Sequence, residues 1–251
     1  MAHEVATDDG DTVKWAFRLP DGATIETVLM KYRDRVTVCI STQAGCAMAC
    51  SFCATGQAGF TRQLTVGEVM EQVVRAARTA APRRLSHVVF MGMGEPLANY
   101  DVTVEVIRRL HAERGMSARN ITVSTVGVAP AIERLAHEGL PVTLAVSLHL
   151  ANDTERDELV PLNRRYNLER LASACERWNE TTKRRLSFEW SLISGVNDTE
   201  RHAAELADYA GPLRAHVNLI PLNPTPGYLV VGSPRERIDA FRAALEDRGI
   251  N

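Results

Sequence analysis

The stretch VTVCISTQAGCAMACSFCATG, residues 36–56, sets the architecture of the chain. It begins with a β-rich apolar run, Val36–Ser41, which has the length and composition of a buried strand. The loop that follows carries three cysteines: Cys46, Cys50 and Cys53. A 3.6-residue apolar period then runs from about Thr65 to Ala80 and predicts a helix. The stretch therefore predicts a strand and a helix joined by a cysteine-bearing loop.

The same alternation of a short strand and a longer helix occurs six times from Val36 onward. We expect strands at residues 36–41, 85–91, 121–124, 142–148, 186–193 and 216–220. We expect helices at residues 65–80, 101–114, 130–138, 168–179 and 199–209, and one that opens at Ser233. Such alternation predicts an α/β fold with a parallel sheet and right-handed crossovers. Because a complete barrel of the common type needs eight repeats, six predict an open or partial (β/α)6 barrel.

Two of the expected helices carry capping signals at their start. Thr65 and Glu68 have the spacing of a capping box, in which a hydroxyl and a carboxylate each satisfy a backbone N–H group. At the last helix we expect Ser233 to be the cap, with Pro234 in the first turn and Glu236 completing the box. Both helices should therefore begin at defined positions.

Residues 1–35 do not follow the alternation. Val13–Leu19 and Thr24–Met30 have strand character and flank the turn Pro20-Asp21-Gly22, which predicts a hairpin. No low-complexity stretch separates this part from the rest of the chain. We therefore expect an N-terminal β-hairpin extension over residues 1–35 and one core domain over residues 36–251.

Composition and charge limit the classes of function. The apolar runs are far shorter than the ~20 residues that span a bilayer, so no membrane partner is expected. The N-terminus lacks the basic and apolar regions of a secretory signal, which favours a cytoplasmic location. With a net charge of −2, binding to nucleic acid would depend on local groups such as Arg164-Arg165 and Lys183-Arg184-Arg185. From charge alone, these are better interpreted as solvated loop charges.

The cysteine pattern favours a metal site. The chain has five cysteines, an odd number, and three lie within eight residues, which argues against a disulfide framework. Three thiolates can hold an iron–sulfur cluster and leave one iron open to a small molecule. The alternatives are three buried thiols or a structural zinc site, which would need a fourth ligand. The Cys-x3-Cys-x2-Cys spacing resembles the signature of the radical S-adenosylmethionine (SAM) superfamily, which implies a [4Fe-4S] cluster and SAM.

Small polar residues occur where the expected strands end. The glycines of Gly92-Met93-Gly94-Glu95-Pro96 permit close backbone approach to an amino-acid ligand, and Glu95 offers a charge to an ammonium group. Three other strands end in Ser124-Thr125-Val126-Gly127, Ser147-Leu148-His149 and Leu222-Asn223-Pro224. Since ligands of such sheets bind at the carboxyl ends of strands, these groups are candidates to contact ribose and adenine. Taken singly, turn residues and a structural histidine are the simpler interpretations.

Longer motifs make the resemblance more specific. They are CATGQAGFTRQLTVGE, VVFMGMGEPLANY, STVG, AVSLHLANDTERDELVPLN and HVNLIPLNPTPG, together with Cys39, seven residues before the cysteine loop. From about Thr12 onward, the chain resembles the RlmN/Cfr family of radical SAM methyltransferases, with RlmN as the closer branch. The resemblance implies methylation of adenine C2 in 23S rRNA and in tRNA.

The resemblance also implies roles for individual residues. Cys46, Cys50 and Cys53 would ligate the cluster. Contacts to SAM are implied for Gly94, Glu95, Ser124, Ser147, Leu148, His149 and Asn223. In the family, a 5′-deoxyadenosyl radical activates a methyl group carried by a cysteine near the C-terminus, and the carbon is added to adenine. Cys39 matches the second cysteine, which resolves the adduct through a disulfide, and Glu26 matches the proton acceptor. From position alone, Cys39 would be a buried thiol and Glu26 a surface charge.

The methyl-carrying cysteine is the main departure from the family. The given sequence has no cysteine after Cys175. That residue shares an apolar helix face with Leu171 and Trp178, so we expect it in the core. The family's small N-terminal RNA-contacting domain is missing as well. We expect either a fragment of a longer methyltransferase, which we favour, or a reduced protein that retains SAM cleavage.

The expected partners are 23S rRNA and tRNA, together with an electron donor such as flavodoxin or ferredoxin, and the chain is expected to be a monomer. Two alternatives to the RNA methyltransferase remain open. One is a radical SAM enzyme that cleaves SAM in a different reaction. The other is a non-catalytic, metal-stabilised RNA-binding module, which bound iron and sulfide would exclude.

Overall fold

The computed structural model describes residues 3–7, 9–225 and 228–251. The chain divides into two compact units. The first comprises residues 1–47 and 58–124, and the second comprises residues 48–57 and 125–251. The last two residues of the HVNLIPLNPTPG motif, Pro226 and Gly227, lie outside the described residues.

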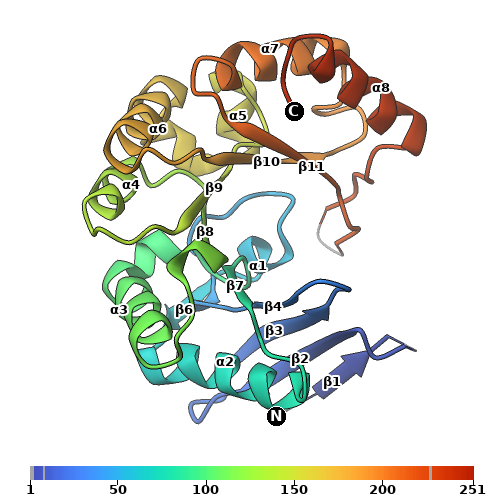
Figure 1. Ribbon diagram of the computed structural model, residues 1–251. Helices are drawn as coiled ribbons and strands as arrows, with labels where there is room; N and C mark the ends of the chain where they lie inside the picture. The colour runs from blue at the N-terminus through green and yellow to red at the C-terminus, as the bar shows by residue number, and fades with distance from the viewer. Residues whose placement is uncertain (1–2, 8, 226–227) are drawn as a thin grey trace. The chain divides into compact units, whose positions relative to one another are not determined.

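The first unit is built on a mixed sheet whose strands lie in the order β1-β2-β3-β4-β7-β8 (Figure 1). Their bounds are β1 His3–Ala6, β2 Thr12–Arg18, β3 Thr24–Lys31, β4 Val36–Cys39, β7 His87–Phe90 and β8 Ile121–Thr125. β1 to β4 pair antiparallel, whereas β4, β7 and β8 pair parallel. The antiparallel part thus contains the expected hairpin, and the parallel part begins at β4.

Helices cover one side of this sheet, and a small hairpin completes the unit. The bounds are α2 Val66–Ala80, α3 Tyr100–Ala112, the 3-10 helices η1 Pro96–Asn99 and η2 Ala118–Asn120, and the hairpin strands β5 Gln43–Gly45 and β6 Phe60–Gln63. Alternate residues of β3 are buried, and the hydroxyl of Thr27 donates to Gln72 of α2 at 2.7 Å. The period of 2 in the strand thus places one side of β3 against the helix.

The second unit has three parallel strands in the order β9-β10-β11. The bounds are β9 Thr143–Ser147, β10 Ser187–Leu192 and β11 His216–Pro221. Its helices are α1 Ala54–Gln57, α4 Ala129–Ala136, α5 Asp153–Leu159, η3 Pro161–Arg164, α6 Leu168–Thr182, α7 Glu200–Ala210 and α8 Arg235–Glu246. Phe188 and Trp190 of β10 contact the rings of Tyr209 in α7 and Phe241 in α8, so this side of the strand faces the helices.

The six expected strand and helix pairs are all present, and the described strands form no closed barrel. The capping box of Thr65 and Glu68 is confirmed. The expected cap at Ser233 is wrong, because α8 has Pro234 as its N-cap without a side-chain cap bond. The Ser233 hydroxyl instead donates to the carboxylate of Asp198 at 2.8 Å. Cys175 is fully buried in α6, as expected. The division into residues 1–35 and 36–251 stays a prediction.

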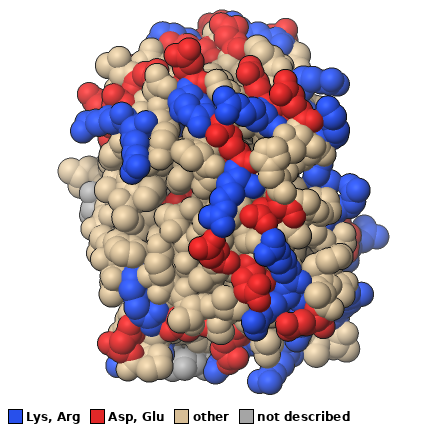
Figure 2. Space-filling view, turned by 90° about the vertical axis from the view of Figure 1, so that its left-hand side faces the viewer, with Lys and Arg blue, Asp and Glu red and all other residues tan. Residues whose placement is uncertain are grey.

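The described surface carries charges of both signs. Figure 2 shows Lys and Arg side chains interspersed with Asp and Glu on one face. Several form ion pairs along helices, such as Arg109 with Glu105 at 2.7 Å and Arg201 with Glu205 at 2.6 Å. Every described helix falls short of the length and apolar character needed to cross a bilayer.

Candidate functional site

The short hairpin of β5 and β6 holds the backbone of the first cysteine. Gly45 has a φ of +77°, and a Cβ atom there would overlap the carbonyl oxygen of Gly59. The N–H group of Cys46 donates to this same carbonyl at 2.8 Å. Only glycine permits this approach at position 45, so the hairpin fixes where the cysteine loop begins.

The other two cysteines lie in a tight turn of the second unit. The N–H group of Cys53 donates to the carbonyl of Cys50 at 3.1 Å, and that of Gln57 donates to the carbonyl of Cys53 at 2.9 Å. A Cβ atom at Gly56 would lie 2.9 Å from the carbonyl oxygen of Cys50, so the chain is compact here. The Gln57 side chain closes the turn by donating to the carbonyl of Ser51 at 2.8 Å.

This turn is anchored on the core of the second unit. Met48, Cys50 and Phe52 pack against a buried apolar cluster formed by Val126, Leu150, Leu159, Val160 and Ile193. The N–H group of Ser51 donates to the carbonyl of Leu159 at 3.2 Å. The ring of Phe52 meets the ring of His149 edge to face, with 4.7 Å between centroids. The turn is therefore held next to one of the residues expected to contact SAM.

The chemistry of the donor set fits a cluster with one open iron. Cys46, Cys50 and Cys53 are half-buried, whereas Cys175 is buried in the core. Thiolates are the usual ligands of iron–sulfur clusters, and partial exposure leaves room for the inorganic atoms. Three ligands would leave the fourth iron for a small molecule.

His149 is held as a neutral imidazole. It follows β9 with a φ of +61°, and its Nδ1 accepts a hydrogen bond from the N–H group of Ser191 at 3.0 Å. Burial, with a smaller contribution from the charge of Arg156, lowers the pKa of His149 to about 3. Since Nδ1 is an acceptor, the ring proton lies on Nε2, which is left as an N–H donor.

Arg156 organises the loops at this edge of the second unit, although no pattern in the sequence points to it. It is only 1% exposed. Its guanidinium donates to the carbonyls of Leu148 at 3.0 Å and Val126 at 2.9 Å, and to the side chain of Asn163 at 2.7 Å. The residue lies within a quoted motif, but arginines are rarely buried, so composition gave no signal for its role.

The glycine loop after β7 is packed against its own chain in the first unit. A Cβ atom at Gly92 would lie 2.7 Å from the carbonyl of Ile40. Gly94 has a φ of +97°, and a Cβ atom there would overlap the side chain of Gln43. Glu95 is buried, its N–H group is bonded to Gln43 at 2.8 Å, and its carboxylate accepts from the first turn of η1. These glycines serve close internal packing, whatever ligand the loop also contacts.

Cys39 and Glu26 lie on one side of the sheet in the first unit. Cys39 is the last residue of β4 and pairs with Val28 of β3, so the alternation of side chains places Glu26 on the same side. Burial, and to a smaller degree the charge of Glu26, raises the pKa of Cys39 to about 12. The Glu26 carboxylate is about half exposed and pairs with the Lys14 ammonium at 2.7 Å. Both candidate catalytic residues are therefore neighbours.

The candidate SAM contacts all lie at carboxyl ends of strands, as expected. Gly94, Glu95 and Ser124 belong to the first unit, after β7 and near the end of β8. The other four belong to the second unit and follow or end β9 and β11: Ser147, Leu148, His149 and Asn223. Asn223 is exposed, whereas Leu148 is fully buried.

Comparisons with known proteins agree with this arrangement. The profile of the radical SAM superfamily matches residues 40–210. The chain is 54% identical to a probable dual-specificity RNA methyltransferase RlmN of Frankia casuarinae, with 98% of this chain and 61% of that protein covered. It is 53% identical to the dual-specificity RNA methyltransferase RlmN 1 of Myxococcus xanthus, with 97% and 69% covered. The chain thus spans between three fifths and about seven tenths of these relatives.

Solved structures show the same fold. A radical SAM methyltransferase from Sphaerobacter thermophilus matches with a TM-score of 0.97 at 55% identity, over 99% of this chain and 74% of that chain. Streptococcus suis SuiB bound to S-adenosylmethionine matches over 87% of this chain with a TM-score of 0.61 at 13% identity, which bears on the fold alone. Together with the cysteine loop, these matches place the chain in the radical SAM superfamily, whose cofactors are a [4Fe-4S] cluster and SAM, and within it in the family of the RlmN methyltransferases.

Proposed function

We propose that this chain is the radical SAM part of an RNA methyltransferase that modifies adenine C2 in 23S rRNA and in tRNA. The observation that carries the proposal is the cysteine loop, in which three half-buried cysteines lie within eight residues of sequence. The sequence identity of more than half with proteins named as dual-specificity RNA methyltransferases supports the RNA substrate.

Cys46, Cys50 and Cys53 would hold the cluster. When bound, it supplies the electron that cleaves SAM and generates the radical. The chain's own contribution is to bind and orient SAM. The Nε2–H group of neutral His149 offers a donor to an acceptor of the cofactor. The remaining proposed contacts are Gly94, Glu95, Ser124, Ser147, Leu148 and Asn223.

Cys39 and Glu26 are the proposed catalytic pair. With a pKa of about 12, the Cys39 thiol is protonated at neutral pH, so it is protected from premature reaction. It must lose its proton before it can attack the sulfur of the methyl-carrying cysteine that the resemblance implies, within the covalent adduct. The disulfide would then form as the bond from that sulfur to the transferred carbon breaks, with the electron pair going to the carbon. Glu26, on the same side of the sheet, is the proposed proton acceptor, and Lys14 keeps its carboxylate in place.

Two further parts of the proposal concern partners and domains. An electron donor such as flavodoxin or ferredoxin would reduce the cluster. Residues 1–35 would form a hairpin extension on a core domain of residues 36–251. The pairing of β3 with β4 supports a hairpin that is continuous with the sheet of the core.

The test is anaerobic reconstitution with iron, sulfide, reductant and SAM, followed by measurement of 5′-deoxyadenosine and of methyladenosine in added 23S rRNA and tRNA. Cys53→Ala should lose cluster iron and SAM cleavage. Cys175→Ala is the matched control, because it also removes one thiol, and it should retain both. Bound zinc without iron would contradict the radical SAM assignment. SAM cleavage with no methylated adenine in either RNA, even in the whole protein, would favour a different radical reaction.

A further inference from the structure

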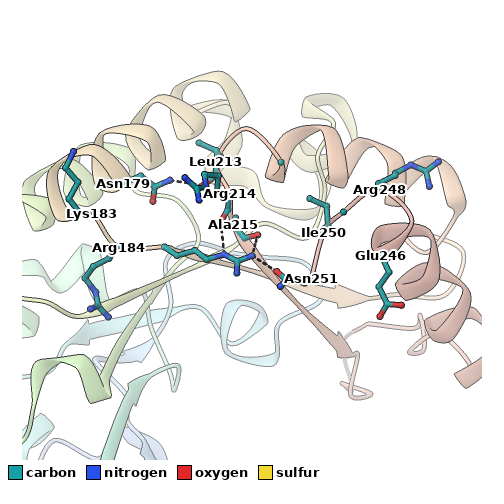
Figure 3. A pocket seen from close by; sticks show the side chains of 13 residues that line it. Asn179, Lys183, Arg184, Leu213, Arg214, Ala215, Glu246, Arg248, Ile250 and Asn251 are labelled. Atoms are coloured by element: carbon teal, nitrogen blue, oxygen red, sulfur yellow. Dashed lines mark hydrogen bonds between the residues drawn. The ribbon is translucent and has the colours of Figure 1, made fainter.

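A cavity of about 940 Å³ lies in the second unit, beside the residues that precede β10 and β11 (Figure 3). Its lining is strongly basic. The charged residues that line it are Lys183, Arg184, Arg185, Arg214, Arg248 and the single carboxylate Glu246. Because the whole chain has a net charge of −2, this concentration of positive charge is a local feature and not a reflection of composition.

Most of these positive charges are not neutralised by neighbouring acids. Among the described residues, no carboxylate lies within 4.0 Å of Lys183, Arg185 or Arg214. Arg248 has only a long contact of 3.9 Å with Glu200. The lining carboxylate, Glu246, has a contact of 3.8 Å with Arg242 outside the cavity. The cavity therefore presents a positive field to solvent.

The cavity wall is built by hydrogen bonds, not left to mobile side chains. The Arg185 guanidinium donates to the carbonyls of Arg214 at 2.7 Å and Ala215 at 3.0 Å, and it also contacts the side chain of Asn251. The Asn179 side chain donates to the carbonyl of Leu213 at 2.8 Å (Figure 3). These bonds join the end of α6 to the segment before β11. Arg185 is therefore held in the cavity wall, whereas the sequence predicted a solvated loop charge at this position.

Two of the basic residues have an unusual backbone. Lys183 has a φ of +55° and Arg214 a φ of +51°, in the left-handed region that non-glycine residues seldom adopt. Both lie in the tight turns that lead from a helix to the next strand. The turns thus fix the starting direction of both side chains at the cavity.

The cavity lies at the amino ends of β10 and β11, whereas the candidate SAM contacts of this unit lie at carboxyl ends. We propose that it is a second RNA contact, in which these ammonium and guanidinium groups bind backbone phosphates of the RNA outside the methylation site. The inference rests on the proposed function. Guanidinium and ammonium groups are the usual partners of phosphate, and such contacts position RNA without reading its sequence.

The test compares a double variant with a charge-matched control in the reconstituted protein. Lys183→Asn/Arg214→Asn removes two charges, and asparagine tolerates the left-handed backbone at both positions. Arg18→Asn/Arg33→Asn removes two charges from exposed positions of the first unit. Binding of an unmodified 23S rRNA transcript and of tRNA is measured from 50 to 300 mM salt, with 5′-deoxyadenosine formation without RNA as a second readout.

The double variant should bind RNA on the order of tenfold more weakly near physiological salt, with a salt slope lower by one to two. The control should match the unaltered protein, and SAM cleavage should be equal in all three. Equal RNA affinity and slope in the two variants would overturn the proposal. An effect on binding of ATP or inorganic phosphate but not of RNA would mean a small-anion site instead. If the double variant binds RNA more weakly but the unaltered protein methylates neither RNA, the RNA contact at the cavity stands and the proposed function fails.

Discussion

The two units hold their strand-end loops by different means. In the first unit, Gly92 and Gly94 let the loop after β7 lie directly against Ile40 and Gln43. In the second unit, one buried side chain, Arg156, bonds the loop after β9 from within. The first arrangement depends on the absence of a side chain, so it can be recognised in the sequence from the two glycines. The second depends on the presence of a side chain that normally lies in solvent. A substitution that adds a Cβ atom at Gly94 therefore tests the first region, and one that removes the Arg156 guanidinium tests the second.

The largest expected effect is the loss of Arg156. Arg156→Met keeps much of the side-chain volume but removes the hydrogen bonds of the buried guanidinium, and the side-chain oxygen of Asn163 loses the donor that Arg156 gives it. We expect a loss of about 3–5 kcal/mol in the free energy of unfolding, measured by urea denaturation. Arg164→Met, at an exposed position, is the control and should change stability by no more than about 0.5 kcal/mol. A loss below about 1 kcal/mol for Arg156→Met would show that the loop does not depend on this residue.

The next effect is expected at the glycine loop. Gly94→Ala adds a Cβ atom that overlaps the Gln43 side chain at a φ of +97°. We expect a loss of about 2–3 kcal/mol, of which about 1 kcal/mol is the backbone conformation alone. Gly22→Ala is the matched control, because Gly22 has a φ of +88° with nothing within 4 Å of the added atom. Equal losses for both variants would mean that the close approach to Gln43 adds nothing.

The buried histidine predicts that the free energy of unfolding depends on pH. The folded pKa of about 3 lies below the ordinary value of 6.5, so the unfolded chain binds the proton first as pH falls. Stability from this group is complete above pH 6.5 and is lost as the pH falls toward 3, by about 2 kcal/mol between pH 7 and pH 5. His149→Asn, which suits the left-handed backbone, should reduce the pH dependence of urea unfolding by this amount. An unchanged dependence would mean that another group is responsible.

The smallest effect is expected at the capping boxes, of which each unit has one at the start of a helix. Thr65 caps α2 with Glu68, and Thr199 caps α7 with His202 in an equivalent box. Thr65→Ala and Thr199→Ala should each cost about 1 kcal/mol in urea unfolding. Should only Thr65→Ala be destabilising, the histidine box would be a geometric coincidence and not a working cap.

The periodic parts of the fold could be predicted from the sequence, and the elements without apolar periodicity could not. All six strand and helix pairs follow from alternating runs, although β7 spans His87–Phe90 and not the expected residues 85–91. α5 was missed because only Arg156 and Leu159 are buried in its acidic sequence. The cap at Ser233 was misassigned because a contact with a distant residue, Asp198, replaced the local one.

The candidate site was predictable where residue type alone carries the chemistry. Cysteine spacing and strand-end motifs identified the loop and its neighbours. The tautomer of His149 was not predictable, because it depends on the N–H group of Ser191, 42 residues further along the chain. The capping box of Thr199 and His202 was not predicted for a different reason: the residue at its third helical position is usually glutamate or glutamine, not histidine.

The bonding around Arg156 also has a consequence for how this part of the chain can change during evolution. Asn163 accepts from Arg156 and donates to Asp153 and Asp157, and Asp153 accepts from the N–H group of Leu168 at the start of α6. Replacing Arg156 leaves the buried side-chain oxygen of Asn163 without this donor, and replacing Asn163 removes an acceptor of the buried Arg156 guanidinium. Among related sequences, Arg156 and Asn163 should therefore be retained together or replaced together, so that their covariation records this bond.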